Sequence, residues 1–203
     1  MDNIEKELEA GRAVIMPTET VYGIFAKALD QEAVDYIYEL KRRPRDKALN
    51  LNVADEKTIR IYSKNQPSYL TKLIHSFLPG PLTIILQANE KVPNWIHSGL
   101  DTVGFRIPDH PKTLELVRKY GPLVGPSANL SGHASGTKYR AIVSEFDQVV
   151  PGIEDDDFLT GQDSTILDIS SSKARILRQG SITKADLLAQ VPELSFEEDE
   201  LPQ

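Results

Sequence analysis

Short apolar runs alternate with amphipathic segments along most of the chain, and this alternation restricts the fold more than any other feature. Over residues 31–41 apolar side chains recur at positions i, i+3, i+4 and i+7, which predicts a helix. Similar patterns predict helices over 2–10, 55–63, 67–78, 110–121 and 183–191. Apolar and β-branched runs predict strands over 13–16, 48–53, 82–88, 102–108, 122–124, 163–170 and 174–180. The segment 141–150 is predicted to contain a helix followed by the end of a strand. Strands that alternate with helices indicate an α/β or α+β class with a mixed sheet.

The 203 residues are enough to bury one core without disulfides or metals. We place a single domain at residues 1–190 and an acidic, flexible C-terminal tail at 191–203, because residues 193–203 carry five carboxylates and no cation. The acidic, turn-rich segment 151–163 is interpreted as a loop near the functional site and not as a linker between domains.

The absence of cysteine excludes disulfides and thiolate metal sites. No run approaches the roughly 18 apolar residues that a membrane span needs, and the charged N-terminal segment lacks the apolar centre of a secretory signal. The predicted location is therefore cytoplasmic. The four histidines, His75, His97, His110 and His133, are far apart in the sequence, so we expect no metal site built from protein side chains.

Residues 41–47, "KRRPRDK", hold five cations in a chain whose net charge is −7. One interpretation is a solvated helix end, where cations complement the helix dipole. The other is a phosphate site, because Pro44 interrupts the run and ends the helix, and a predicted strand follows at once. Arginine on a rigid loop can bind two phosphate oxygens together.

The segment 125–137, "GPSANLSGHASGT", contains eight Gly, Ala or Ser residues among thirteen. Small side chains let main-chain N–H groups approach an anion closely, and Ser127, Ser131, Ser135 and Asn129 add polar groups. The alternative is a flexible loop, although Pro126 and the preceding strand anchor the segment. The loop is not a Walker P-loop, since Gly-Lys-Ser/Thr is missing.

Polar groups also stand at several other strand ends. "PTET" at 17–20 follows a strand and is either a turn with a helix cap or a polar pocket wall. Arg106 lies in an apolar strand and either extends to solvent or binds a carboxylate. "DSTI" at 163–166 and Arg178 repeat the pattern.

Neither a G-x-S-x-G elbow nor a base partner for Ser127 is present, so a serine hydrolase is excluded. The residues predict a cationic site lined by glycine and serine that binds a nucleotide and a small zwitterion. Proximity and charge stabilisation would carry catalysis there, without a covalent nucleophile.

Taken in order, "PTETVYG", "KRRPRDKAL", "PGPLTIIL", "TVGFRIPDHP", "GPSANLSG", "DSTILD" and "LRQG" resemble the YrdC/TsaC family, the threonylcarbamoyl-adenylate synthases of tRNA modification. The matches span roughly residues 10–180. The resemblance implies a twisted, open α/β sheet with flanking helices around a large, concave, positively charged cavity. It corresponds to the short form, for which no extra C-terminal domain is expected.

By this resemblance the activity is that of a nucleotidyltransferase, which converts L-threonine, bicarbonate and ATP into threonylcarbamoyl-AMP and pyrophosphate. Mg²⁺ is expected with the ATP, and partner proteins are expected to transfer the threonylcarbamoyl group to tRNA beside the anticodon. Contact with tRNA or double-stranded RNA is a further expectation.

The resemblance also implies roles for individual residues. The catalytic set is Lys41, Arg43, Ser127 and Asn129, which form the family's K-x-R and S-x-N pairs. The threonine set is Thr20, Asn52, Arg106, Gly125 and Ser164, with Arg106 on the carboxylate. The ATP set is Arg43, Lys47, Thr102, Ser127, Ser135 and Arg178.

Three positions depart from the family pattern. Phe25 stands where a small residue is usual, Ala48 where proline is common, and Asn52 where histidine is frequent. These departures concern the shape of the threonine pocket. Two other functions stay open at this point: an RNA- or nucleotide-binding module without synthase activity, and a related carbamoyl-transfer domain or inactive paralogue. Retention of both residue pairs argues against inactivity.

Overall fold

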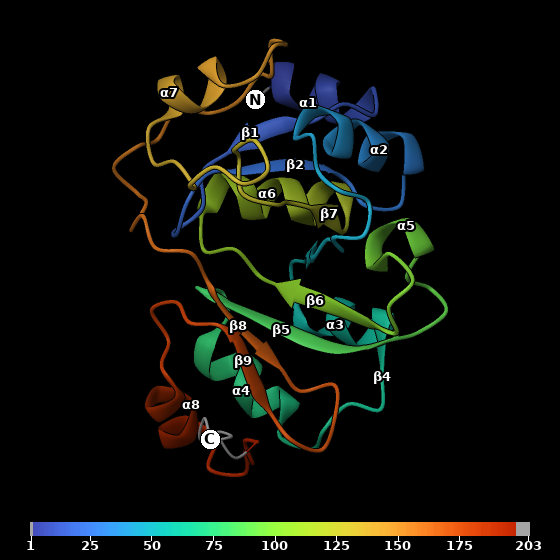
Figure 1. The fold of residues 1–203 in the computed structure, drawn as a ribbon, viewed down its shortest axis with the longest axis vertical. Helices are drawn as coiled ribbons and strands as arrows, with labels where there is room; N and C mark the ends of the chain where they lie inside the picture. Colours follow the sequence, from blue (N-terminus) through green and yellow to red (C-terminus); the bar gives the residue numbers. More distant parts are fainter. Residues whose placement is uncertain (1, 198–203) are drawn as a thin grey trace, which may run out of the picture.

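Nine strands of the described residues, 2–197, form one mixed sheet in the computed structural model (Figure 1). The strand order is β1-β2-β7-β3-β6-β5-β8-β9, and β4 pairs with β5 beside this path. The pairs β3–β6 and β5–β8 are parallel, whereas the others are antiparallel. The strands are β1 (Val14–Met16), β2 (Gly23–Lys27), β3 (Leu51–Asn52), β4 (Ser63–Lys64), β5 (Leu82–Ala88), β6 (Thr102–Arg106), β7 (Leu123–Val124), β8 (Thr165–Asp168) and β9 (Arg175–Arg178).

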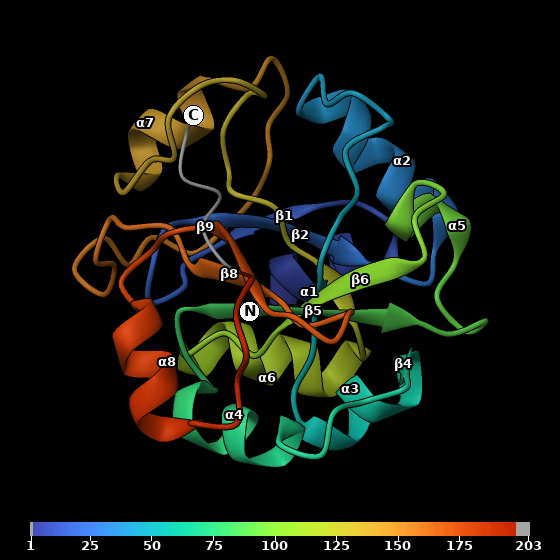
Figure 2. The same cartoon turned by 60° about the horizontal axis from the view of Figure 1, so that its bottom comes forward.

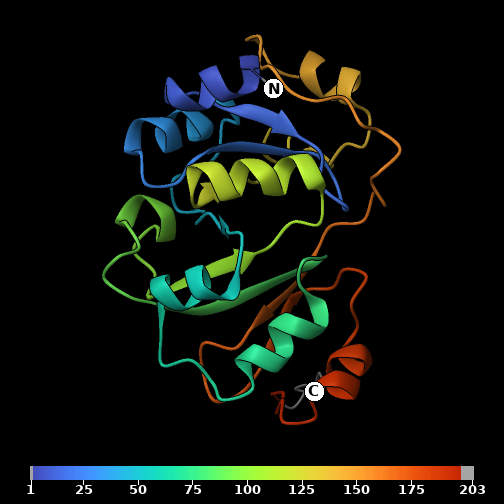
Figure 3. The same ribbon diagram turned by 180° about the vertical axis from the view of Figure 1, so that it is seen from behind.

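Helices cover both sides of the sheet. Figure 2 shows α2, α5 and α7 on one side and α3, α4, α6 and α8 on the other, and Figure 3 shows α3, α4 and α6 in front of the strands from behind. The helices are α1 (Asp2–Glu9), α2 (Gln31–Leu40), α3 (Glu56–Tyr62), α4 (Leu70–Phe77), α5 (Asn94–His97), α6 (Pro111–Tyr120), α7 (Tyr139–Ser144) and α8 (Lys184–Gln190). The predicted class, a mixed α/β sheet with flanking helices, is confirmed.

The apolar core has two parts, and β2 contributes to both. Ile24 and Ala26 belong to the main cluster, while Phe25 belongs to a smaller one. In the smaller cluster, Ile4 and Leu8 of α1 pack with side chains from α6, β1 and β7. Because successive strand residues point to opposite faces, a strand buried on both faces is apolar throughout.

Side-chain caps fix the start of several helices. Asp30 and Asp55 accept hydrogen bonds from main-chain amides in the first turns of α2 and α3. Thr183 is the N-cap of α8, and it forms a capping box with Asp186. Each cap satisfies amides that have no partner within the helix.

Several element predictions were wrong in their bounds. The helix predicted over 31–41 agrees with α2, which ends at Leu40, but the strand expected over 48–53 contains only Leu51–Asn52. No strand forms at 149–150 among the described residues; instead Gly152 makes an isolated bridge with Ile15. The strands β2 and β4 and the short helix α5 were missed, because a run of two to five residues gives too few positions to show a period.

The tail expected from residue 191 packs against the domain in its first part. Val191 and Leu194 are buried, and Phe196 forms a bridge with Ala174. The acidic residues 198–200 of that prediction lie outside the described residues. No helix within 2–197 is long and apolar enough to cross a membrane.

Candidate functional site

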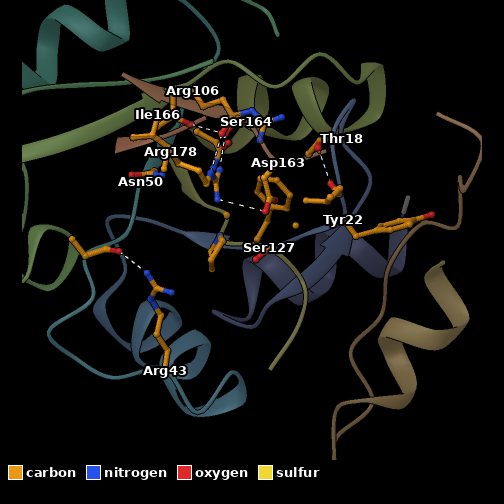
Figure 4. A pocket seen from close by; sticks show the side chains of 18 residues that line it. Thr18, Tyr22, Arg43, Asn50, Arg106, Ser127, Asp163, Ser164, Ile166 and Arg178 are labelled. Carbon is orange, nitrogen blue, oxygen red and sulfur yellow. Dashed lines mark hydrogen bonds and ion pairs between the residues drawn. The ribbon is translucent and has the colours of Figure 1, made fainter. Parts of the chain in front are cut away.

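A cavity of about 260 Å³ is lined by residues of β2, β3, β5, β6, β8 and β9 and of the loops beside them (Figure 4). Its polar lining comes from Thr18, Tyr22, Arg43, Asn50, Asn52, Thr83, Arg106, Ser127, Asp163, Ser164 and Arg178. Val21, Gly23, Phe25, Ala48, Gly125, Pro126 and Ile166 complete the lining. Three guanidinium groups and one carboxylate thus face the same space, so the charged side chains of the lining carry a net positive charge.

Arg106, the last residue of β6, forms one end of the site. Its Nη2 donates to Oε1 of Glu19 and to Oγ1 of Thr20, each at 2.7 Å. Oε2 of Glu19 accepts from the main-chain N–H of Asp109 at 3.0 Å, which fixes the carboxylate. The buried Nε of Arg106 has no hydrogen-bond partner among the described residues. An unpaired buried donor costs free energy. Because Nε has almost no exposed surface, the Arg106 side chain meets the cavity through its other atoms.

Ser164 and Arg178 form a second polar group, at the ends of β8 and β9. Arg178 donates from Nε to the main-chain oxygen of Ser164 at 2.9 Å and from Nη2 to its Oγ at 3.0 Å. The Ser164 hydroxyl also lies 3.0 Å from Oγ1 of Thr83. Asp163 stands 3.6 Å from Nη1 of Arg178 and accepts from the Ser135 hydroxyl at 3.2 Å. The arginine is therefore held in place although its side chain is 43% exposed.

Arg43 lies on the loop that follows α2. Its Nη2 donates to the main-chain oxygen of Ala48 at 2.8 Å, and Nε donates to that of Lys47 at 3.2 Å. Burial lowers the pKa of Arg43, but a guanidinium stays protonated in proteins. The guanidinium is thus a fixed positive charge at the cavity wall (Figure 4).

Lys41 lies behind the small-residue loop, with only 2% of the residue exposed. Its Nζ donates to the main-chain oxygens of Ser127 and Asn129. Burial is the main cause that lowers the pKa of Lys41 to about 7, and the charge of Arg43 adds to it. Asn129 in turn donates to the carbonyls of Leu130 and His133, each at 2.9 Å. These contacts hold the loop from inside the protein.

The structure brings seven of the predicted site residues to the cavity: Arg43, Asn52, Arg106, Gly125, Ser127, Ser164 and Arg178. Three others, Thr20, Lys41 and Asn129, are buried directly behind the lining and bonded to it. Ser135 touches the lining only through Asp163.

The two remaining predicted residues, Lys47 and Thr102, also lie outside the lining. Lys47 is exposed, and its recorded hydrogen bonds are made by the main chain: its oxygen accepts from Tyr38 and Arg43, and its N–H donates to Pro44. Thr102 begins β6, whereas Arg106 ends it. At about 3.3 Å per strand residue, some 13 Å separates these two positions.

Sequence reasoning also missed residues that the cavity uses. Thr83 and Asn50 line the cavity, and Glu19 holds Arg106. Asn50 and Asn52 stand two apart, which puts both side chains on one face of a strand, and that spacing could have identified Asn50. The expectation that segment 151–163 lies near the site is confirmed, since Asp163 lines the cavity.

The described residues contain no group of three or more His, Asp or Glu side chains that could hold a metal ion. Asp163 is the one carboxylate of the cavity lining, and it is already paired with Arg178 and Ser135. Any divalent ion in the cavity would therefore take most of its ligands from a bound molecule or from water.

Comparison with known proteins gives close relatives. A threonylcarbamoyl-AMP synthase of Pyrococcus abyssi is 37% identical over 86% of this chain, and one of Bacillus subtilis is 38% identical over 90%. The chain spans about half the length of these two curated relatives, 52% and 54%. A putative threonylcarbamoyl-AMP synthase of Methanocaldococcus jannaschii is 37% identical, and there the match covers 86% of the relative.

Solved structures show the same fold. The crystal structure of P. abyssi Sua5 complexed with L-threonine superposes with a TM-score of 0.88 at 34% identity, over 95% of this chain and 57% of that one. The structure of E. coli YciO has a TM-score of 0.78 at 22% identity over 89% of this chain and 88% of that one, and supports the fold alone. The family model described as "Telomere recombination", Sua5_yciO_yrdC, matches residues 6–180. This chain therefore belongs to the Sua5–YciO–YrdC family.

Proposed function

We propose that this chain is a threonylcarbamoyl-AMP synthase, which joins L-threonine, bicarbonate and ATP and releases pyrophosphate. The observation that carries the proposal is the convergence of two separately built groups on one cavity. Arg106 and Asn52 supply one group, and Arg43 and Arg178 supply the other. The named activity of relatives at 37% and 38% identity supports the same reading.

The Arg106 end suits the carboxylate of threonine. Its Nη2 donates to Glu19 and Thr20, and these contacts orient the guanidinium where Arg106 lines the cavity. A carboxylate oxygen in the cavity would accept a charge-assisted hydrogen bond from this guanidinium. Asn52 and Ser164 are near enough to the same space to bind the amino or hydroxyl group of the amino acid. The L-threonine in the structure of P. abyssi Sua5 supports L-threonine as a ligand of this chain.

The other cations suit a triphosphate. Arg43 and Arg178 line the cavity together with Ser127 of the small-residue loop. Lys47, Thr102 and Ser135 belong to the ATP set by family resemblance alone. For these three residues to contact ATP, either the ATP would extend beyond the cavity or the loops would move. Lys47 lies on an exposed loop, where such a movement meets little resistance. Lys41 and Asn129 act by holding the loop that carries Ser127.

The reaction balances without a covalent enzyme intermediate. The amino nitrogen of threonine forms a bond to the carbon of bicarbonate, water leaves, and an N-carboxylate results. An oxygen of this N-carboxylate then attacks the α-phosphorus of ATP. The bond between the α-phosphorus and the oxygen that leads to the β-phosphate breaks, and pyrophosphate is released. The enzyme's contribution would be to hold the reactants together and to stabilise the charge on the leaving pyrophosphate through Arg43 and Arg178.

Mg²⁺ is proposed to enter with ATP, since phosphate oxygens and water can supply most of its ligands. When bound, it would neutralise phosphate charge. By resemblance, partner proteins in the cytoplasm would then transfer the threonylcarbamoyl group to tRNA. The protein's class would be that of a nucleotidyltransferase.

The test is pyrophosphate release by the purified protein with ATP, Mg²⁺ and bicarbonate, with and without L-threonine. Release that requires both threonine and bicarbonate, with threonylcarbamoyl-AMP found by mass spectrometry, is the expected result. No release, with binding of tRNA or double-stranded RNA, would instead support the RNA-binding module.

A further inference from the structure

Phe25 and Asn52 come from different strands and meet above one glycine. A Cβ atom built on Gly125 would lie 2.4 Å from Cε1 of Phe25 and 2.6 Å from Nδ2 of Asn52. Both distances start from one point, so the ring carbon and the amide nitrogen are no more than about 5 Å apart. Distances below 3.0 Å leave no room for a methyl group. The ring and the amide thus occupy the space that a side chain at residue 125 would take.

The strand registers place this contact in the wall of the cavity. Asn52 stands opposite Leu123 in the β3–β7 pair, and opposite Arg106 in the β3–β6 pair. Gly125 is two residues beyond Leu123, so both face the same side of the sheet. Lys27 also pairs with Leu123, which puts Phe25 on that side too. One face of the sheet therefore carries Phe25, Gly125, Asn52 and Arg106 in sequence across the strands.

The ring of Phe25 is a rigid part of this wall. Its residue is 1% exposed, and a Cβ atom built on Gly23 would lie 2.5 Å from Cε2. Glycines on both sides, at residues 23 and 125, let the ring lie flat against the main chain. Because the ring still lines the cavity, it supplies an apolar surface beside Asn52.

We propose that Phe25 and Asn52 form one size-setting pair, which fits the amino-acid end of the cavity to the side chain of threonine, with the ring against its methyl group. The proposal rests on the proposed function, in which Arg106 binds the carboxylate. With the carboxylate at Arg106, the amino-acid side chain has the Phe25 ring as its apolar boundary and the Asn52 amide as its polar one.

The first test is selectivity between L-threonine and L-serine, which differ by one methyl group. A methyl group in an apolar pocket changes kcat/KM by roughly 10- to 200-fold. In Phe25→Ala we expect the threonine-to-serine ratio of kcat/KM to fall by about fivefold or more. Ile24→Ala is the matched control, because Ile24 is buried on the same strand but belongs to the opposite, main core cluster. It should lower stability and leave the ratio unchanged.

The second test is a double-mutant cycle with Phe25→Ala, Asn52→His and the double variant. Asn52→His alone places an imidazole against the Phe25 ring and should raise KM for threonine about tenfold or more. In the double variant the ring is gone, so the imidazole can occupy the space that the ring filled. We expect the double variant to bind threonine better than the product of the single effects predicts. The same coupling is read in the free energy of unfolding, measured with urea, which requires no activity.

Every outcome of these two tests either supports or overturns the size-setting pair. Additive effects in both KM and the free energy of unfolding, or an unchanged threonine-to-serine ratio in Phe25→Ala, would overturn the pair. If the unsubstituted protein releases no pyrophosphate with threonine, the proposed function fails and with it the size-setting role. The unfolding measurements would then still show whether the two side chains share one space.

Discussion

Nη2 of Arg106 donates to Oε1 of Glu19 at 2.7 Å, and both side chains are largely buried, 13% and 14% exposed. The carboxylate is fixed on its other oxygen by the amide of Asp109. Glu19 therefore holds Arg106 in one orientation and offsets part of its charge. The ion pair belongs to the fold as well as to the site, since it joins the β1–β2 connection to the end of β6.

Glu19→Gln should lower the free energy of unfolding by about 2 kcal/mol, because a mostly buried guanidinium loses its charged partner. Urea denaturation measures this loss. Asp147→Asn is the matched control: Asp147 pairs with Arg42, and both side chains are more than two-thirds exposed, 82% and 69%. That exposed pair should contribute about 0–1 kcal/mol. Equal losses in the two variants would contradict the structural role of Glu19.

Arg106→Ala should raise KM for threonine far more than KM for ATP. The reason is that in the proposed function Arg106 binds the carboxylate of threonine, while Arg43 and Arg178 bind the phosphates, and all three line the cavity. Steady-state pyrophosphate release at varied threonine and at varied ATP measures the two constants. An equal rise in both would show that Arg106 does not bind the carboxylate.

Arg43→Ala should leave the fold intact and abolish ATP turnover. One charge-assisted hydrogen bond to phosphate contributes about 1.5–3 kcal/mol, which corresponds to roughly 10- to 150-fold in ATP affinity. Calorimetric titration with ATP measures the affinity, and pyrophosphate release measures the turnover. Arg42→Ala is the control from the same loop, because Arg42 pairs with exposed Asp147 and does not line the cavity. Turnover that survives in Arg43→Ala would remove the phosphate role.

The comparison of sequence with structure shows which kinds of signal are reliable. β5 agrees with its predicted range, 82–88, because six of its seven residues are apolar or β-branched and follow a Gly-Pro break, which gives a long, clear pattern. The helix predicted over 183–191 agrees with α8, whose N-cap is Thr183, because a cap signal is local in the sequence. By contrast, β2 was missed, since its five residues follow the polar turn at 17–20 without a break signal, and its burial on both faces depends on partners far along the chain.

The candidate site shows the same contrast between features that are local in the sequence and features that depend on the fold. Charge clusters and small-residue loops are visible in the sequence, so Arg43, Ser127 and Arg178 could be found. What the sequence does not contain is the direction of each side chain. Lys41 and Arg43 are two residues apart in one basic run, yet the first points inward to the loop carbonyls and the second lines the cavity. That difference comes from the end of α2 at Leu40 and from the positive φ of 49° at Arg42, which turns the chain.

The buried Lys41 makes stability depend on pH in a specific direction. Its pKa is about 7 in the folded protein and 10.5 in an ordinary lysine, so between these values the unfolded chain binds more protons. The free energy of unfolding should therefore rise as the pH rises from 7 towards 10, by at most about 1.4 kcal/mol per pH unit. Urea denaturation of the wild-type protein and of Lys41→Met at pH 7, 8 and 9 isolates this contribution as the difference between the two. A difference that stays constant across the three values would mean that Lys41 remains charged in the folded protein, held by the carbonyls of Ser127 and Asn129.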